Sequence, residues 1–139
     1  MAGSFFTPRM FLIVGGVVLL LLGVVGFLGV FTKAAVPAFW LDSGENVAHV
    51  ALGVIALAAV YVPGLNSALA PYYRWIVLLV GVIALFFGVY GFVVANNTEP
   101  NTFGLANLEL SDNILHLVVA AWAFASALMT RPAMQPRMG

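Results

Sequence analysis

The chain has 139 residues, of which 63% are hydrophobic and 7% are charged, and its five cations balance its five acids. An ordinary soluble domain is roughly 25% charged, so these charges are too few to cover the surface of a soluble protein of this size. Disorder needs low hydrophobicity and nucleic-acid binding needs a basic surface, so the composition excludes a disordered chain and argues against a nucleic-acid partner. It favours an integral membrane protein of one domain.

Four apolar runs are long enough to cross a bilayer, which takes about 20 mostly apolar residues of helix. In chain order they cover about residues 10–31, 45–62, 73–95 and 112–130. The sequence therefore predicts an all-α fold, an integral membrane four-helix bundle within a single transmembrane domain, residues 1–139.

Residues at the ends of these runs indicate where the helices start and stop. Pro63-Gly64 follows the second run and is expected to end its helix. Ser43 or Gly44 is the expected N-cap of the second helix, and Ser111 is the expected N-cap of the fourth.

The charges divide by sign between the two ends of the predicted bundle. Four cations fall at the end that holds both termini and the middle link: Arg9, Arg74, Arg131 and Arg137. The other end holds Lys33 and every acid: Asp42, Glu45, Glu99, Glu109 and Asp112. By the positive-inside rule, both termini are expected in the cytoplasm, and the two long loops face outward.

Two sequence patterns recur along the chain. The glycines of the first run return at an offset of 65 residues: Gly16, Gly23 and Gly26 match Gly81, Gly88 and Gly91. Glu45-Asn46-x-x-His49 returns at an offset of 67 as Asp112-Asn113-x-x-His116. The chain is therefore predicted to consist of two parallel helix-hairpin repeats, about residues 10–62 and 73–130, whose glycines let the helices pack closely.

The Asn-x-x-His pairs are the candidate site. Asn46 and His49 share one helix face, as do Asn113 and His116, and polar groups in a span usually face protein. In the structural interpretation, the acid before each pair complements the helix dipole, and the asparagine and histidine bond to loop carbonyls or to each other. In the alternative interpretation, the two histidines bind haem b, a chlorophyll-type pigment or another metal, or they titrate near neutral pH.

The sequence contains no motif of a known catalytic or structural metal site. It has no cysteine, which removes disulfides, thiolate zinc sites and iron–sulfur ligation. It also lacks the phosphate-binding loop, the His-Glu-x-x-His zinc motif and the Gly-x-Ser-x-Gly nucleophile turn. We therefore expect neither catalytic residues nor a metal site.

Three segments carry a resemblance to a known family: Gly23-Val-Val-Gly26-Phe27, the run from Asn46 to Gly53, and the run from Asn107 to His116. With them the chain resembles an uncharacterised bacterial family of small four-span membrane proteins, a domain of unknown function, over about residues 10–130. In that family a glycine stands four residues after the second histidine, at the place that Gly53 holds after His49. This chain has Ala120 there. The resemblance implies a location in the bacterial plasma (cytoplasmic) membrane and implies no activity.

The preferred functional prediction is a small non-enzymatic membrane protein without a cofactor. It would act as an accessory or scaffold subunit that packs against other membrane proteins or against copies of itself within the lipid bilayer. A haem b or pigment-binding subunit that uses His49 and His116 is the first alternative. A small-molecule or proton carrier is the second, and the lack of charges within the spans argues against it.

Overall fold

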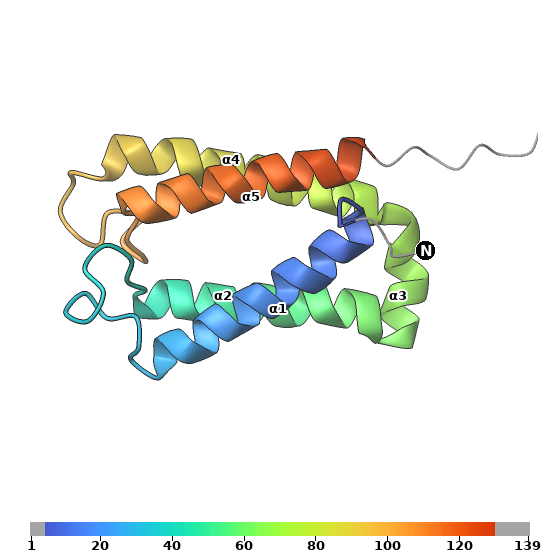
Figure 1. The fold of residues 1–139 in the computed structure, drawn as a ribbon, viewed down its shortest axis with the longest axis horizontal. Coiled ribbons are helices and arrows are strands. Elements are labelled where there is room, and N and C mark those ends of the chain that lie inside the picture. The colour runs from blue at the N-terminus through green and yellow to red at the C-terminus, as the bar shows by residue number, and fades with distance from the viewer. Residues whose placement is uncertain (1–4, 130–139) are drawn as a thin grey trace, which may run out of the picture.

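The computed structural model describes residues 5–129, and within them the chain consists of helices and loops (Figure 1). The elements are α1 (Pro8–Phe27), α2 (Ser43–Tyr61), α3 (Pro63–Leu69), the short 3-10 helix η1 (Ala70–Tyr72), α4 (Tyr73–Val94) and α5 (Leu110–Leu128). Four of the helical segments are long and apolar enough to cross a membrane: α1, α2, the continuous segment of α3, η1 and α4, and α5. The predicted all-α fold with four membrane-type helices is confirmed. Arg131 and Arg137, which the sequence placed beside Arg9 and Arg74, lie outside the described residues.

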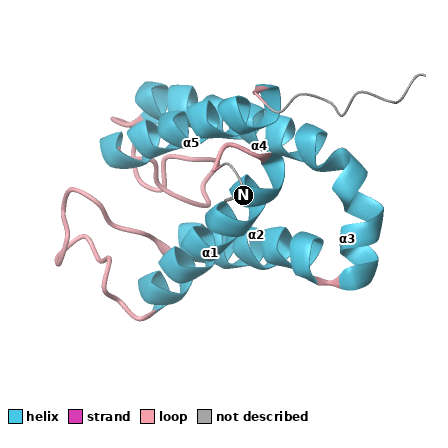
Figure 2. Cartoon of the chain, turned by 45° about the vertical axis from the view of Figure 1, so that its right-hand side comes forward, coloured by secondary structure: helices cyan, strands magenta, loops and turns pink. Residues whose placement is uncertain are grey.

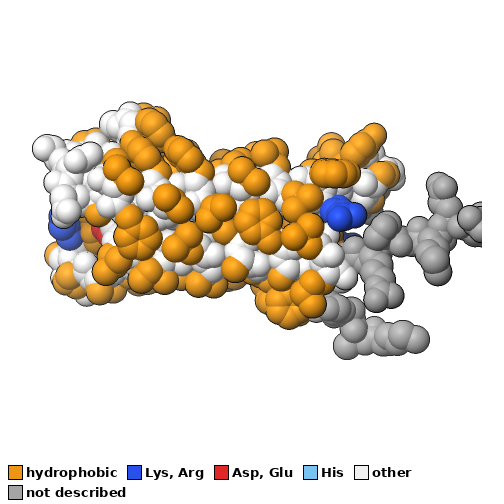
Figure 3. Space-filling model, turned by 90° about the horizontal axis from the view of Figure 1, so that it is seen from above, with side chains coloured by type: hydrophobic (Ala, Val, Ile, Leu, Met, Phe, Trp, Pro, Cys, Tyr) orange, Lys and Arg blue, Asp and Glu red, His pale blue; other side chains and the backbone are white. Residues whose placement is uncertain are grey.

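The four long helices form two antiparallel hairpins. Helix α1 packs along α2, and α4 packs along α5 (Figure 1). The 28–42 and 95–109 loops lie at the same end of the molecule, opposite α3, as Figure 2 shows. We call the loop end the outer end and the α3 end the inner end. On the face seen in Figure 3, apolar side chains cover the flank, and charged side chains appear only toward the two ends.

Helix α1 ends at Phe27, four residues before the end of the apolar run that the sequence assigned to it. Gly29 has φ +75, a left-handed conformation that glycine adopts without strain. This turn lets the N–H of Gly29 donate to Gly26 O at 3.0 Å and the N–H of Val30 donate to Val25 O at 3.4 Å. These two bonds form a Schellman motif, which uses the helix's last carbonyls and redirects the chain into the outer loop.

The link between the second and third predicted spans is helical. Helix α2 ends at Tyr61, just before the expected Pro63-Gly64 stop, and Pro63 then takes the first position of α3. Proline suits that position because its missing N–H would have no partner within the helix there. The short α3 and η1 cross the inner end and lead directly into α4, as Figure 1 shows.

Glycines on α1 and α4 allow close helix contact within each hairpin. A Cβ atom added at Gly23 would lie 2.6 Å from Val50 Cγ2 and 2.7 Å from the backbone oxygen of Asn46, both on α2. A Cβ atom added at Gly88 would lie 2.8 Å from Leu117 Cδ2 and 3.2 Å from the Asn113 backbone oxygen, both on α5. The two hairpins therefore use the same device at positions 65 residues apart.

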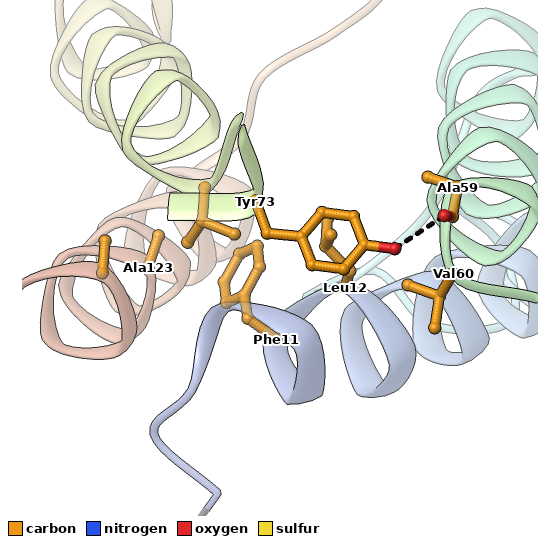
Figure 4. Close-up of a cluster of buried hydrophobic side chains, with 8 residues drawn as sticks. Phe11, Leu12, Ala59, Val60, Tyr73 and Ala123 are labelled. Carbon is orange, nitrogen blue, oxygen red and sulfur yellow. Dashed lines mark hydrogen bonds between the residues drawn. The ribbon is translucent and has the colours of Figure 1, made fainter. Parts of the chain in front are cut away.

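The hairpins pack against each other through an apolar cluster at the inner end, shown in Figure 4. Its buried members come from all four long helices: Phe11, Leu12, Ala59, Val60, Tyr73, Val77, Ala123 and Ala127. The Tyr73 hydroxyl lies 2.7 Å from Ala59 O and 2.7 Å from Asn66 Oδ1, so the phenol ring extends from α4 to α2. This cluster sets the position of one hairpin relative to the other at the inner end.

We predict that Gly23→Ala lowers the thermal unfolding temperature of the detergent-solubilised protein. The new methyl group would meet α2 backbone, which cannot move as a side-chain tip can, so we expect a loss of about 1–3 kcal/mol. Gly64→Ala is the matched control because nothing lies within 4 Å of a Cβ atom there, and it should be neutral or slightly stabilising. Equal unfolding temperatures for the two variants would contradict the glycine-contact interpretation.

Candidate functional site

The outer ends of α2 and α5 carry the residues that the sequence singled out. Helix α2 starts at a capping box, in which Asp42 Oδ1 accepts from the N–H of Glu45 and Glu45 Oε2 accepts from the N–H of Asp42, both at 2.9 Å. The prediction of Ser43 or Gly44 as the N-cap was wrong. Asp42 takes that position because Glu45, three residues on, completes the reciprocal pair, and the Asp42 carboxylate also reaches a second partner in the other outer loop.

Helix α5 starts in a similar way. Its N-cap is Glu109, and the N–H of Glu109 lies 3.4 Å from Oδ2 of Asp112, three residues on. The expected N-cap Ser111 is instead inside the first turn, with its hydroxyl buried and without a hydrogen bond. An acid therefore holds the N-cap position of both helices, and a second acid follows three residues later, where it complements the helix dipole.

Asn46 and Asn113 lie inside the hairpins rather than between them. Asn46 is 4% exposed and Asn113 is fully buried. The Oδ1 atom of each faces a glycine of the paired helix, Gly26 or Gly91, and a Cβ atom at either glycine would overlap that oxygen. The two oxygens therefore occupy space that only glycine leaves open.

Neither asparagine side-chain oxygen forms the hydrogen bond that the sequence predicted. Neither Oδ1 nor Nδ2 of Asn113 has a hydrogen-bond partner, and neither does Oδ1 of Asn46. The glycine Cα–H groups that face these oxygens supply the weak contacts known from close helix interfaces. The asparagines are thus packed inside each hairpin against a glycine, and Asn113 does not reach a loop carbonyl.

The two histidines have different surroundings. His116 Nδ1 lies 2.8 Å from Asp112 O, one turn earlier in the same helix, and the His116 ring lies 5.9 Å from the ring of Phe87 on α4. This contact is with a helix carbonyl rather than with a loop. Nδ1 of His49 is buried and has no hydrogen-bond partner. If Nδ1 of His116 donates to the carbonyl, Nε2 is left as the acceptor that a metal or pigment would use.

The polar connection between the hairpins was missed at the sequence level. Asp42 Oδ2 accepts from the backbone N–H of Asn107 at 2.7 Å and from Asn107 Nδ2 at 3.0 Å. Asn107 is 8% exposed and its own Oδ1 accepts from the N–H of Asn101 at 3.3 Å. Asp42 thereby caps α2 and holds the 95–109 loop at the same time. The only available signal was the presence of Asn107 in the motif that resembles the family.

A second contact between the outer loops lies at the surface. Lys33 Nζ binds Glu99 Oε1 at 2.7 Å, and Lys33 also lies over the ring of Trp40, 5.1 Å from its centroid. Both ends of the ion pair are largely exposed, so solvent screens it and it contributes little to stability. The buried Asp42–Asn107 contact is therefore the stronger connection.

Glu109 is in an unusual environment for a carboxylate. Both of its side-chain oxygens are buried, and the Asp112 carboxyl lies beside them. Burial, followed by the nearby charge of Asp112, raises the pKa of Glu109 to about 8, while Lys33 acts in the opposite direction. The outer end therefore holds a carboxyl group that binds a proton near neutral pH.

The arrangement offers no cluster of ligands for a metal ion within residues 5–129. No group of three histidine, aspartate or glutamate side chains there is placed to hold one. What the outer end does offer is two partly buried imidazoles and two buried amides, each fixed by its own hairpin. These groups suit packing and capping, and the imidazoles keep the capacity to bind a ligand singly.

Comparison with protein families identifies a family for this chain. A family model described as "Domain of unknown function (DUF4383)" matches residues 9–129, which cover the four long helices except the first residue of α1, and both outer loops. The comparison with curated proteins and the comparison with solved structures each found no match. The resemblance to a four-span family of unknown function is confirmed.

We predict that Asp42→Ala destabilises the protein more than a single substitution in a surface loop usually does. It leaves the N–H of Glu45 and two donors of Asn107 without their acceptor, which should cost about 1–3 kcal/mol. Glu99→Gln is the matched control because it removes an exposed ion pair worth at most about 1 kcal/mol. Thermal unfolding in detergent measures both, and a larger effect of Glu99→Gln would show that the assignment of the main loop contact is wrong.

We also predict a pH dependence that involves Glu109. Its pKa is raised from 4.5 to about 8 on folding, so the folded state binds more protons than the unfolded state between these values. Stability should therefore fall as pH rises through this window and level off above about pH 8. Glu109→Gln stays neutral at every pH. From pH 5 to pH 8, the unfolding temperature of the wild type should therefore fall relative to that of the variant. A constant difference would mean that the carboxyl group titrates normally.

Proposed function

The chain belongs to the family of the domain of unknown function DUF4383, and from this membership and the outer-end geometry we propose that it is a non-enzymatic accessory or scaffold subunit in a membrane. The observation that carries the proposal is the set of contacts made by the polar residues of the outer end. Asn46 and Asn113 pack against glycines of their own hairpins, and Asp42 holds Asn107. These contacts support a role in building a stable membrane body rather than in acting on a substrate.

The exposed surface of the helices supports a packing role. Only 22% to 33% of each span's residues are buried within the chain. The helices of one hairpin approach those of the other mainly through α1. Long faces of all four helices thus remain available to lipid and to other membrane proteins, including further copies of this chain.

We propose in addition that the protein resides in the plasma membrane with both termini in the cytoplasm. Arg9 and Arg74 at the inner end support this orientation, since all the acids lie at the outer end. We further propose that the two hairpins are copies of one ancestral unit. The matching roles of Gly26 with Asn46 and of Gly91 with Asn113 support that origin.

We predict that a photo-crosslinking residue at Ile55, on the exposed face of α2, joins the chain to one defined membrane protein in native membranes. The same residue at Val93, on the exposed face of α4, tests whether the interface is confined to one hairpin. A discrete crosslinked band, with co-migration of both proteins after extraction in digitonin, is the expected result. Lipid adducts alone from both positions, together with a monomer after extraction, would overturn the subunit proposal.

The alternative of a haem b or pigment-binding subunit is favoured by one contact. The Nδ1 atom of His116 lies against a backbone carbonyl. In many metal-bound histidines, the ring nitrogen that does not bind the metal makes such a contact, and this contact orients the ring. His49 and His116 would be the ligands, and the buried Asn46 and Asn113 would hold the helices around them. The absorption spectrum of the digitonin extract tests this directly. A Soret or pigment band that His116→Ala abolishes would establish the alternative, and a flat spectrum would exclude it.

A further inference from the structure

Within residues 5–129, the inner end carries positive charge and no carboxylate to neutralise it. Arg9 and Arg74 are each the second residue of their helices, α1 and α4, and they lie 65 residues apart, the same offset as the paired glycines. Every aspartate and glutamate of the chain is at the outer end. An ion partner for these arginine side chains must therefore come from outside the described part of the chain.

Arg74 has a hydrogen-bond donor without a partner. Its Nε atom is buried and has no hydrogen-bond partner. Two hydroxyl groups of the same helical segment are engaged elsewhere: that of Tyr73 with Ala59 O and Asn66, and that of Ser67 with Pro63 O at 2.8 Å. The chain therefore supplies no acceptor for this guanidinium, and its terminal Nη groups remain available to an acceptor from the membrane side.

The residues beside Arg74 indicate its depth in a membrane. Trp75 is 66% exposed and Tyr72 is similarly exposed, and aromatic side chains of this kind gather at the level of lipid headgroups. The Arg74 guanidinium lies 5.9 Å from the ring centroid of Trp75. The charged group, near the start of α4, is therefore expected at headgroup depth.

We propose that Arg74 binds the phosphate of an anionic phospholipid in the leaflet at the inner end. A guanidinium can donate two parallel hydrogen bonds to a phosphate. Arg74 is half-buried and only its Nε is enclosed, so its terminal Nη groups are the donors that a headgroup can reach. Arg9 is exposed and adds attraction for an anionic headgroup without a buried donor. This lipid site depends neither on the proposed subunit role nor on which side of the membrane the inner end faces.

Native mass spectrometry of the purified full chain in detergent tests the proposal. Phosphatidylglycerol and phosphatidylcholine with identical acyl chains are added in equal amounts, and the lipid-bound fractions are compared. We expect the wild type to prefer phosphatidylglycerol by roughly tenfold and Arg74→Gln to lose that preference. Arg74→Lys, which keeps the charge without the planar fork, should retain only part of it.

Lys33→Gln is the matched control, because this cation at the outer end is already paired with Glu99. It should leave the lipid preference unchanged. Equal binding of the two lipids by the wild type, or an undiminished preference in Arg74→Gln, would overturn the proposal. Displacement of phosphatidylglycerol by millimolar inorganic phosphate would do so as well, since it would indicate a site for a free anion.

Circular dichroism and thermal unfolding without added lipid establish that each variant is folded. If Arg74→Gln fails this check, the comparison of wild type with Arg74→Lys decides, and an equal preference in these two would overturn the proposed bidentate contact. The measurement uses the isolated chain and two defined lipids. A failure to find a partner subunit therefore leaves this result unaffected, and a failure to bind lipid leaves the subunit proposal unaffected.

Discussion

Close approach of paired helices at glycine positions is the constraint on which the rest of the structure depends. In a bilayer the surrounding lipid is as apolar as the side chains, so helices gain little from leaving it and must associate through dense contact. Gly23 and Gly88 provide that contact, because an added methyl group would collide with the neighbouring helix. Once α1 lies against α2 and α4 against α5, Asn46 and Asn113 fit only where Gly26 and Gly91 leave space. The positions of the histidines follow from those of the asparagines, three residues earlier in each helix.

The two ends of the molecule hold the hairpins together by different means. At the inner end, an apolar cluster around Tyr73 and Val77 joins all four long helices. At the outer end, polar loop contacts centred on Asp42 and Asn107 make the connection. Each hairpin is internally tight, and the two hairpins approach each other mainly through α1, whose N-terminal half lies against Trp122 of α5. This division fits a bilayer, in which water and headgroups are available to polar groups only at the ends of the spans.

The sequence predicted the parts of this fold that depend on local pattern. Four apolar runs, the Pro63-Gly64 stop and the glycine faces were readable because span length and helical spacing are local properties. The N-cap of α2 was misassigned because Asp42, Ser43 and Gly44 are all good N-cap residues, although Asp42-x-x-Glu45 is the local pattern of the capping box that the structure shows. The partner of Asn113 was beyond prediction. Sequence rules pair an amide with a polar group, whereas here its oxygen faces the Cα–H of Gly91. Helix α3 was missed because it is only seven residues long.

The asparagine–glycine contact also has a consequence for how this protein can change over evolutionary time. Gly26 cannot acquire a side chain while Asn46 keeps its position, and the same holds for Gly91 and Asn113. Each pair should therefore be inherited as a unit, and a substitution at one member should survive only with a compensating change at the other. Because the two pairs lie in separate hairpins, each is free to drift without the other. Covariation within a hairpin, with independence between hairpins, is the expected record of this packing in related sequences.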